Sequence, residues 1–370
     1  MKGKKIINIA AALLICAGGM LLVFSAGEAA AGAAQAVSIC LGVIIPSLFA
    51  FTVISKLFIS TGVYRLTAKP FSPISRYIFR LPEEYFPVLI ISQLAGYPIG
   101  AALINELLRN KRISPKESGE LLCFCIAPGP AFIYAVTATA IPECPDAWKA
   151  VFIAVCGTNL LGALVTAPLR HIPPKKSAEI DLTFTAEIFT RSVKNGSETM
   201  LMICAMIVFT GAFLGVISET DFFAEIAGFL SRISGISTPS LIPVIRSFFE
   251  ISNLSLIKGD PLTLLPITAA MLSFGGICVH LQICSACGEV PFAKALISRL
   301  PCAVISFFIC QKMIPLFYKV TAVAVNANIP GISIGISNGG RHSSPILSVF
   351  LLIMTILLIS QKNVAKKEKM

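Results

Sequence analysis

Charged residues are scarce in this sequence. Asp, Glu, Lys and Arg make up 13% of its 370 residues, about half of the roughly one quarter that soluble domains carry. Apolar residues supply 55% of the chain, and its mean hydropathy is +0.83. A water-soluble fold of this size is therefore excluded, and the composition indicates a chain that lies in a lipid bilayer.

Enzyme motifs are also lacking. The sequence has only three histidines, and it contains no HExxH motif, no glycine-rich nucleotide loop and no Gly-x-Ser-x-Gly motif. We therefore expect neither an enzyme nor a cofactor or metal site. Because no motif suited to ATP hydrolysis is present, transport by this chain would depend on an ion gradient or on the gradient of the substrate itself.

Cysteine is present, but not in a pattern that binds metal. Most of the twelve cysteines lie inside apolar stretches and lack the paired spacing of a zinc site or of a disulfide framework. We interpret them as small apolar packing residues. Only Cys144, Cys284 and Cys287 lie near an expected membrane edge, and the sequence leaves open whether they form a disulfide.

Basic residues outnumber acidic ones, with 30 Lys and Arg against 19 Asp and Glu and a formal charge of +11. A nucleic-acid-binding protein would gather these cations on one face, whereas here they cluster in short connections between apolar stretches. That distribution is the positive-inside bias of membrane proteins. We therefore expect the lipid bilayer, and no nucleic acid, as a partner.

Apolar stretches of the right length define the expected spans. A helix of roughly 20 residues crosses a hydrocarbon core of about 30 Å. The sequence predicts eight such helices, with both termini in the cytoplasm. They cover residues 6–24, 36–59, 120–141, 148–169, 198–217, 262–285, 292–318 and 345–360.

Two further apolar segments, 86–108 and 239–258, are interrupted by Gly, Pro and polar residues. Basic residues flank the first segment on both sides, with Arg80 before it and Arg109 after it. A segment with cytoplasmic signals on both flanks enters and leaves by the same face, so we expect a re-entrant hairpin. The second segment would form another hairpin that opens to the outside.

One order of elements occurs twice: a helix, an amphipathic linker, a hairpin and two helices. The predicted fold class is therefore an all-α polytopic membrane protein, with about eight transmembrane helices and two re-entrant hairpins in an inverted repeat. The expected parts are a peripheral N-terminal helix and loop (1–35), a first repeat (36–170), a cytoplasmic linker (171–197), a second, inverted repeat (198–318), and an outer loop, last helix and basic tail (319–370).

Inverted repeats with broken helices are typical of secondary transporters. Non-helical backbone is tolerated at membrane depth only where it is buried or lines a cavity, so the breaks indicate a substrate path. Amides freed at a helix start would suit an anion. A packed kink without a ligand is the alternative for the first break, and a role in tying helices together is the alternative for Asn159. The candidate substrate-binding residues of the first half are Gln93, Gly96, Tyr97, Pro98, Gly100, Pro128, Gly129, Pro130 and Asn159.

The second half contributes five more candidates: Arg246, Glu250, Asn253, His280 and Gln282. A charge at the bilayer centre costs roughly 2.5–3.5 kcal/mol and therefore usually faces a cavity. Glu250 is suited to couple a proton or cation, and Arg246 is suited to bind a carboxylate. The alternative is that the two form an i, i+4 pair on one helical face near the interface. For His280, packing is favoured over a relay role.

Several of these runs resemble a known family. Ala95-Gly96-Tyr97-Pro98-Ile99-Gly100-Ala101, the basic run from Arg109 to Ser114 and Gly129-Pro130-Ala131-Phe132 are similar to the sporulation integral membrane protein family of YlbJ type, which carries the nucleoside-recognition (Gate) domain twice. The resemblance covers about residues 46–317. It implies a multi-pass protein of the outer forespore membrane that moves dipicolinic acid, a small planar dianion, during sporulation. Where that family is expected to place polar residues before Gly-Pro, this chain has Ile126-Ala127-Pro128.

Other interpretations remain open from the sequence. A nucleoside or other small-metabolite symporter would share the architecture, and a non-transporting membrane scaffold that recruits sporulation partners is a different class of function. The driving ion, the direction of transport and the oligomeric state are not predicted. We expect the first helix to stay uncleaved, because its apolar stretch exceeds the roughly 7–15 residues of a signal peptide core.

Overall fold

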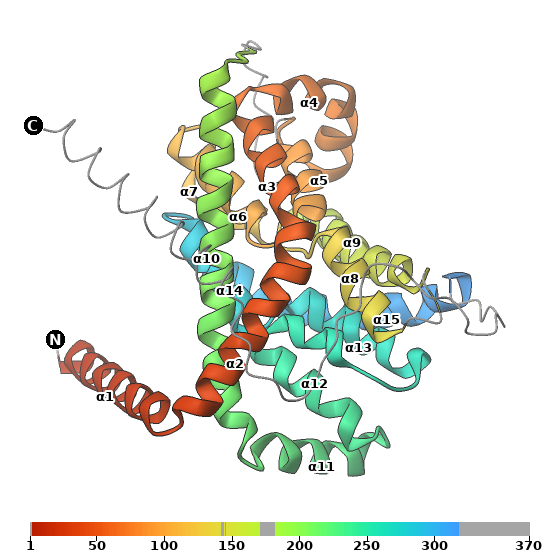
Figure 1. Cartoon of the computed structure of the whole chain (residues 1–370). Helices are drawn as coiled ribbons and strands as arrows, with labels where there is room; N and C mark the ends of the chain where they lie inside the picture. The colour runs from red at the N-terminus through yellow and green to blue at the C-terminus, as the bar shows by residue number, and fades with distance from the viewer. Residues whose placement is uncertain (1, 84, 142–143, 145, 171–181, 318–370) are drawn as a thin grey trace, which may run out of the picture. The chain divides into compact units, whose positions relative to one another are not determined.

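The computed structural model describes residues 2–83, 85–141, 144, 146–170 and 182–317. These residues form α-helices, short π- and 3₁₀-helical turns and connections, without a strand (Figure 1). The all-α class is therefore confirmed. The predicted helix 345–360, the rest of the segment 319–370 and residues 171–181 of the predicted linker lie outside the described residues.

Five of the described helical segments are long and apolar enough to cross a membrane. The count of eight spans stays a prediction, because length and composition identify only five of the described segments as able to cross. Helix α1 (Lys2–Phe24) covers the predicted helix 6–24. The five long segments are Ala26–Ser60, formed by α2 (Ala26–Ile39), η1 (Cys40–Ile44) and α3 (Ile45–Ser60); Ala147–Leu169, formed by α9 (Ala147–Val165) and η3 (Ala167–Leu169); α10 (Ala186–Ser218); Pro261–Cys287, formed by α13 (Pro261–Phe274) and α14 (Ile277–Cys287); and α15 (Ala293–Phe317).

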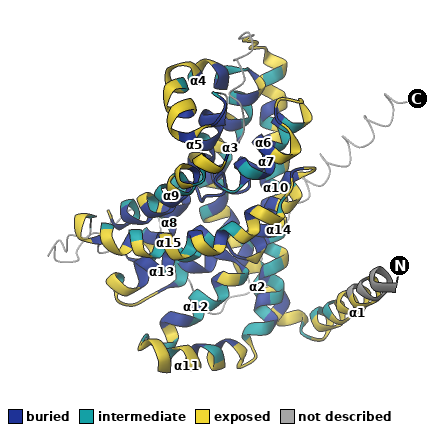
Figure 2. Ribbon diagram, turned by 180° about the vertical axis from the view of Figure 1, so that it is seen from behind, coloured by how far each residue is buried: buried dark blue, intermediate teal, exposed yellow. Residues whose placement is uncertain are grey.

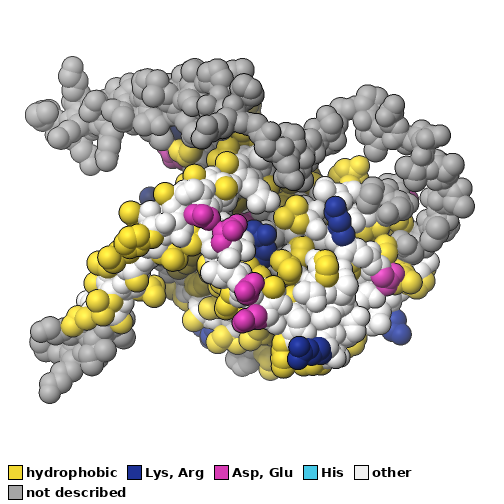
Figure 3. Space-filling model, turned by 60° about the horizontal axis from the view of Figure 1, so that its bottom comes forward, with side chains coloured by type: hydrophobic (Ala, Val, Ile, Leu, Met, Phe, Trp, Pro, Cys, Tyr) yellow, Lys and Arg dark blue, Asp and Glu magenta, His cyan; other side chains and the backbone are white. Residues whose placement is uncertain are grey.

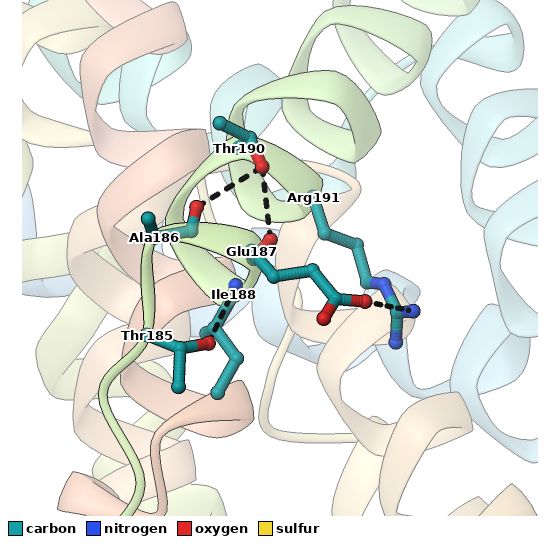
Figure 4. A network of polar contacts seen from close by, with 6 residues as sticks. All are labelled: Thr185, Ala186, Glu187, Ile188, Thr190 and Arg191. Atoms are coloured by element: carbon teal, nitrogen blue, oxygen red, sulfur yellow. Dashed lines mark hydrogen bonds and ion pairs between the residues drawn. The ribbon is translucent and has the colours of Figure 1, made fainter.

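Two spans begin earlier than predicted. The segment expected at 36–59 starts at Ala26, so the predicted external loop within 25–35 is wrong: the alanine-rich run has the strongest intrinsic helix propensity and continues the helix. The segment expected at 198–217 starts at Ala186. There the Thr185 hydroxyl accepts a hydrogen bond from the Ile188 amide at 3.2 Å, and Arg191 pairs with Glu187 at 3.2 Å, which stabilises the added turns (Figure 4).

The remaining helices complete a repeated order of elements. After the first long segment come α4 (Val63–Pro73) with η2 (Ile74–Phe79), then α5 (Tyr85–Ala95) and α6 (Ile99–Arg109), then α7 (Pro115–Leu122) and α8 (Pro130–Ala140), then α9. After α10 come α11 (Phe222–Ser234), then α12 (Thr238–Phe249) and η4 (Ile251–Leu256), then α13 and α14, then α15. The same series of a long helix, a short helix, a broken pair, a second broken pair and a helix thus occurs twice, while the predicted domain boundaries and opposite senses stay predictions.

The two predicted amphipathic linkers are helical, as α4 with η2 and α11. Both expose part of their apolar side chains, including Leu66, Ile78, Phe229 and Ile233 (Figure 2). Each can therefore lie flat in a membrane interface with its apolar side toward the acyl chains.

Side-chain caps determine where two of the broken helices begin. Ser114 and Glu117 form a reciprocal capping box at the start of α7. Asp260 accepts hydrogen bonds from the amides of Leu262 and Thr263 at the start of α13. The Thr263 hydroxyl also donates to the Asp260 carboxylate at 2.7 Å and holds the pKa of that carboxyl below its usual value.

Small residues let α2 and α10 pack with their backbones in contact (Figure 1). A Cβ placed on Gly32 would lie 2.3 Å from the carbonyl oxygen of Gly211, and one placed on Gly215 would lie 2.3 Å from that of Glu28. Such distances exclude any side chain larger than hydrogen. We call this contact, made by Gly32 and Ala36 of α2 with Gly211 and Gly215 of α10, the glycine seam; it is the small-residue packing common between membrane helices.

Large apolar side chains remain exposed over much of the described surface. On the face that Figure 3 shows, hydrophobic side chains are spread widely and charged side chains are few. Leu14 on α1, Phe209 on α10 and Leu300 on α15 are each at least 60% exposed. In water such a surface would drive aggregation, whereas acyl chains are its natural solvent.

Candidate functional site

Four interruptions of helices meet at one place, which we call the central junction. They are Gly96–Pro98 between α5 and α6, residues 123–129 between α7 and α8, Glu250 between α12 and η4, and Gly275-Gly276 between α13 and α14. The predicted breaks at Gly96-Tyr97-Pro98 and at Pro128-Gly129-Pro130 are confirmed, and Gly275-Gly276 separates α13 from α14.

Glycines make the contacts between these breaks possible. A Cβ on Gly96 would lie 2.9 Å from the Gly129 amide nitrogen, so the first two breaks touch through their backbones. A Cβ on Gly276 would lie 2.8 Å from the Ser247 carbonyl oxygen, which brings the other two breaks together. Gly96, Gly275 and Gly276 also have positive φ angles, which disfavour any side chain there.

Tyr97 connects the two pairs of breaks. Its hydroxyl donates a hydrogen bond to the Leu272 carbonyl oxygen near the end of α13, and its ring lies beside Gly275. Packing of η4 against α8 adds a second connection. All four breaks therefore belong to one buried centre, as expected for non-helical backbone at membrane depth.

Gly100 is a packing residue in this structure. A Cβ there would lie 2.1 Å from the Cys125 carbonyl oxygen, so the unwound segment lies directly on the start of α6. This contact fits the packed-kink alternative for Gly100, and the anion site at the freed amides of that helix start stays a prediction. Pro130 is the first residue of α8, where its missing amide hydrogen costs nothing.

A fully buried polar network holds the unwound segment 123–129. The Gln93 amide donates to the Phe124 carbonyl oxygen at 2.8 Å. The Asn159 amide donates to Gln93 Oε1 at 2.8 Å and to the Ile126 carbonyl oxygen at 3.0 Å. Asn159 therefore ties α9 to α5 and to the break, which is the helix-tying role left open by the sequence.

Arg299 is the central member of this network and was not among the sequence candidates. Its side chain is 0% exposed and donates to the Ile126 carbonyl oxygen at 3.0 Å, to Asn159 Oδ1 at 3.2 Å and to the Cys123 carbonyl oxygen. These partners are neutral, so the guanidinium charge is solvated by dipoles rather than cancelled by a carboxylate. The signal that could have found it is its position: Arg299 lies within the predicted span 292–318, at the seventh residue of α15, and an ionisable residue inside a span is a functional candidate by default.

The second half places its acidic candidate differently from the prediction. Helix α12 ends at Phe249, and Glu250 has extended backbone with its carboxylate capping η4 through the Ser252 amide at 3.2 Å. The alternative of an i, i+4 pair of Arg246 and Glu250 on one helical face is therefore wrong, and among the described residues no ion pair joins the two. Arg246, Glu250 and Asn253 line one small cavity of about 20 Å³, which we call the small cavity.

His280 is packed between the rings of Phe274 and Phe292 on the buried side of α14, with ring centroids 5.1 and 6.2 Å away. Neither ring nitrogen has a hydrogen-bond partner among the described residues. The packing interpretation of His280 therefore fits this structure better than a relay. Gln282, two residues further along, is also buried and donates a hydrogen bond to the Cys278 thiol at 3.3 Å.

A cavity of about 960 Å³ lies between α3, α6, α10 and α14, and we call it the large cavity. It reaches the central junction at Pro98, and Gln282 lines it from α14. Its charged lining consists of Lys56, Arg109 and Arg191 against Glu106 and Glu198, so cations are in excess by one. Four amides add hydrogen-bonding capacity: Asn105, Asn110, Asn195 and Gln282.

No known protein family, curated protein or solved structure matches this chain. The resemblance to the sporulation family of YlbJ type therefore stays a prediction, and the geometry of the chain itself has to support any proposal about function.

The structure brings the fourteen sequence candidates to one region but divides them among different tasks. Pro98 and Gln282 line the large cavity; Arg246, Glu250 and Asn253 line the small cavity. The thiols of Cys144, Cys284 and Cys287, left open by the sequence, are free. The other candidates build the junction itself: Gln93 and Asn159 in the polar network, Tyr97 and His280 in packing contacts, and Gly96, Gly100, Pro128, Gly129 and Pro130 in the breaks.

Proposed function

We propose that the chain is a secondary membrane transporter for a small organic anion, with dipicolinic acid as the expected substrate and the outer forespore membrane as the expected location. The observation that carries the proposal is the large cavity, which ends at a junction of four broken helices. Broken helices facing a cavity near the centre of a repeated fold are the usual build of a transport site. An enzyme or a scaffold has no evident need for this arrangement.

Charge supports an anionic substrate. Arg299 carries a buried positive charge that no carboxylate cancels, and the lining of the large cavity has one more cation than anions. A small dianion approaching the junction would therefore be attracted by the excess of positive charge. The choice of dipicolinic acid rests on the resemblance of the sequence, and the expected location rests on it as well.

The positive-inside bias places the large cavity on the cytoplasmic side. Lys56, Arg109 and Arg191, which line it, belong to the stretches that the sequence predicts to be cytoplasmic. The small cavity and the glycine seam lie toward the ends of α2 and α10 that are predicted to face outward. Under this predicted topology the large cavity would open inward, and the packed glycine seam would lie on the outer side.

A nucleoside symporter is the second candidate, and the four amides of the large cavity favour it, because amides pair with the edges of bases and with ribose hydroxyls. Competition separates the two substrates: dipicolinate flux should be unaffected by excess nucleoside if the anion is the substrate.

The proposal is tested with purified protein in liposomes, by measuring the uptake of radiolabelled dipicolinate. We expect Met202→Trp, which fills the large cavity, to lower the initial flux several-fold. Phe209→Trp is the matched control, since it lies on the same helix, is 60% exposed and does not line the cavity. Equal flux in both variants, or no flux above empty liposomes in the wild type, would reject the transport proposal and favour the scaffold.

A further inference from the structure

Glu250 is a buried carboxyl group with an unfilled hydrogen-bonding position. Its side chain is only 3% exposed; the Ser252 amide donates to Oε1 at 3.2 Å, while Oε2 has no partner among the described residues. The neighbouring Ser252 hydroxyl is likewise buried and unpartnered. An ionised carboxylate left in this condition is unfavourable, because burial removes the water that would solvate it.

The small cavity gives this carboxyl group access to one small ligand. Its volume of about 20 Å³ is enough for a single water molecule. Ser252 and Asn253 line it beside Glu250, and Gln35 lines it from α2. The glycine seam borders it, because Gly32 and Gly211 belong to both.

The groups around Glu250 favour a proton over a metal cation. Arg246 lines the same cavity with its Nε buried and unpartnered, and its fixed positive charge would repel a metal ion held there. The other titratable groups that face Glu250 are thiols, namely Cys278 on α14, Cys40 on η1 and, through Cys40, Cys204 on α10.

We propose that Glu250 is the proton-coupling site of the transporter, an inference that rests on the proposed transport function and deepens it. A proton from water forms an O–H bond at Oε2, and the same bond breaks when the proton is returned to water on the other side. The buried site accommodates the neutral acid, whose O–H can donate to a water molecule in the small cavity or to an adjacent oxygen. The ionised form requires contact with solvent. Glu250 is therefore protonated while the segment 239–258 is closed around it and ionised when that segment opens.

Two transport assays in liposomes, gradient-driven uptake and exchange, test the inference. Dipicolinate uptake should rise several-fold under an imposed inward proton gradient in the wild type, and Glu250→Gln should lose this stimulation while keeping dipicolinate–dipicolinate exchange, which needs no net proton movement. Glu225→Gln, at an exposed position on α11, is the matched control and should respond like the wild type. A Glu250→Gln variant that keeps the stimulation overturns the inference, even though transport itself stands.

An infrared measurement tests the protonation of Glu250 independently of transport. The purified wild type should show the carbonyl stretch of a protonated carboxyl group that Glu250→Gln removes and Glu225→Gln leaves in place. Absence of that band in the folded wild type overturns the proton site. Absence of both exchange and uptake, with the band present, instead rejects the transport function on which the coupling role rests.

Discussion

Arg299 sets the electrostatics of the central junction from a single position. Its guanidinium reaches two carbonyl oxygens of the unwound segment, those of Cys123 and Ile126, and the side-chain oxygen of Asn159. These acceptors belong to backbone that has left the helix and therefore lacks its usual partners. One side chain thus supplies donors to the break and positive charge to the site.

We predict that Arg299→Met abolishes dipicolinate flux and destabilises the protein. The substitution keeps an apolar stem of similar length but leaves buried acceptors unpaired, at a cost of about 1–3 kcal/mol for each one. The measurement is thermal unfolding in detergent together with flux in liposomes. Arg299→Lys, which keeps the charge but not the fork of donors, should recover part of the stability.

The exposed Lys294 on the same helix provides the control for this prediction, because Lys294→Met removes a cation that lies outside the network. If Arg299→Met unfolds at the same temperature as Lys294→Met and transports as well as it does, the role given to Arg299 is wrong.

At the residue scale, the sequence indicates which polar residues have a role better than it indicates which groups they contact. Gln93, Asn159 and Glu250 stand out because polar groups in apolar stretches are costly unless they have a task. Their contacts could not be predicted, since the Asn159 network joins four segments far apart in the chain. Arg299 was missed because it lies near the start of its helix, where a basic residue can be taken for a flanking cytoplasmic signal.

At the scale of elements, glycine and proline predicted most of the breaks. Gly96-Tyr97-Pro98 and Pro128-Gly129-Pro130 interrupt the helices where the local signals place them, because both residue types act through the backbone alone. Pro243 does not interrupt its helix but lies inside α12. The break falls instead at Glu250, where neither glycine nor proline marks it in the sequence. That break depends on contacts with distant segments, which a single sequence does not reveal.

The glycine seam gives a prediction at this scale. Gly211→Leu should lower the thermal unfolding temperature markedly and reduce the yield of folded protein, because even a Cβ there would lie 2.5 Å from that of Ala36. The two long helices would have to separate to accept the new side chain. Thermal unfolding monitored by fluorescence in detergent checks the effect.

Gly42→Ala is the matched control for the seam, because a Cβ at Gly42 would meet no atom within 4 Å. It should be close to neutral. Wild-type stability in Gly211→Leu would show that α2 and α10 do not pack as described.

At the scale of the whole molecule, two series of elements with the same order build one core. The long segment Ala26–Ser60 packs against α10, the long helix that opens the second series, and α9 packs against α15, the helix that closes it. Equivalent elements are therefore partners across the repeat, an arrangement that suits a pseudo-twofold relation. The opposite senses of the two series through the membrane stay a prediction.

Cysteine labelling tests that topology. In a background with the exposed Cys16 and Cys284 changed to serine, one new cysteine at a time replaces Tyr77 in the first linker, Lys111 after α6 or Glu219 after α10, all exposed positions. The variants are expressed in a host that inserts them into its plasma membrane. A membrane-impermeant maleimide applied to these intact cells should label only Glu219→Cys, while Tyr77→Cys and Lys111→Cys should react after permeabilisation. Labelling of Tyr77→Cys and Lys111→Cys from different sides would contradict the first re-entrant hairpin.

The unequal size of the two cavities has a consequence for hydration. The large cavity, at about 960 Å³, has room for many water molecules, whereas the small one, at about 20 Å³, has room for one. Under the proposed cycle, each closure of the inner side expels most of this water into the surrounding solution. The balance between the two states then depends on osmotic pressure: solutes too large to enter the large cavity favour its collapse, and a compartment that loses water draws the protein toward the closed state.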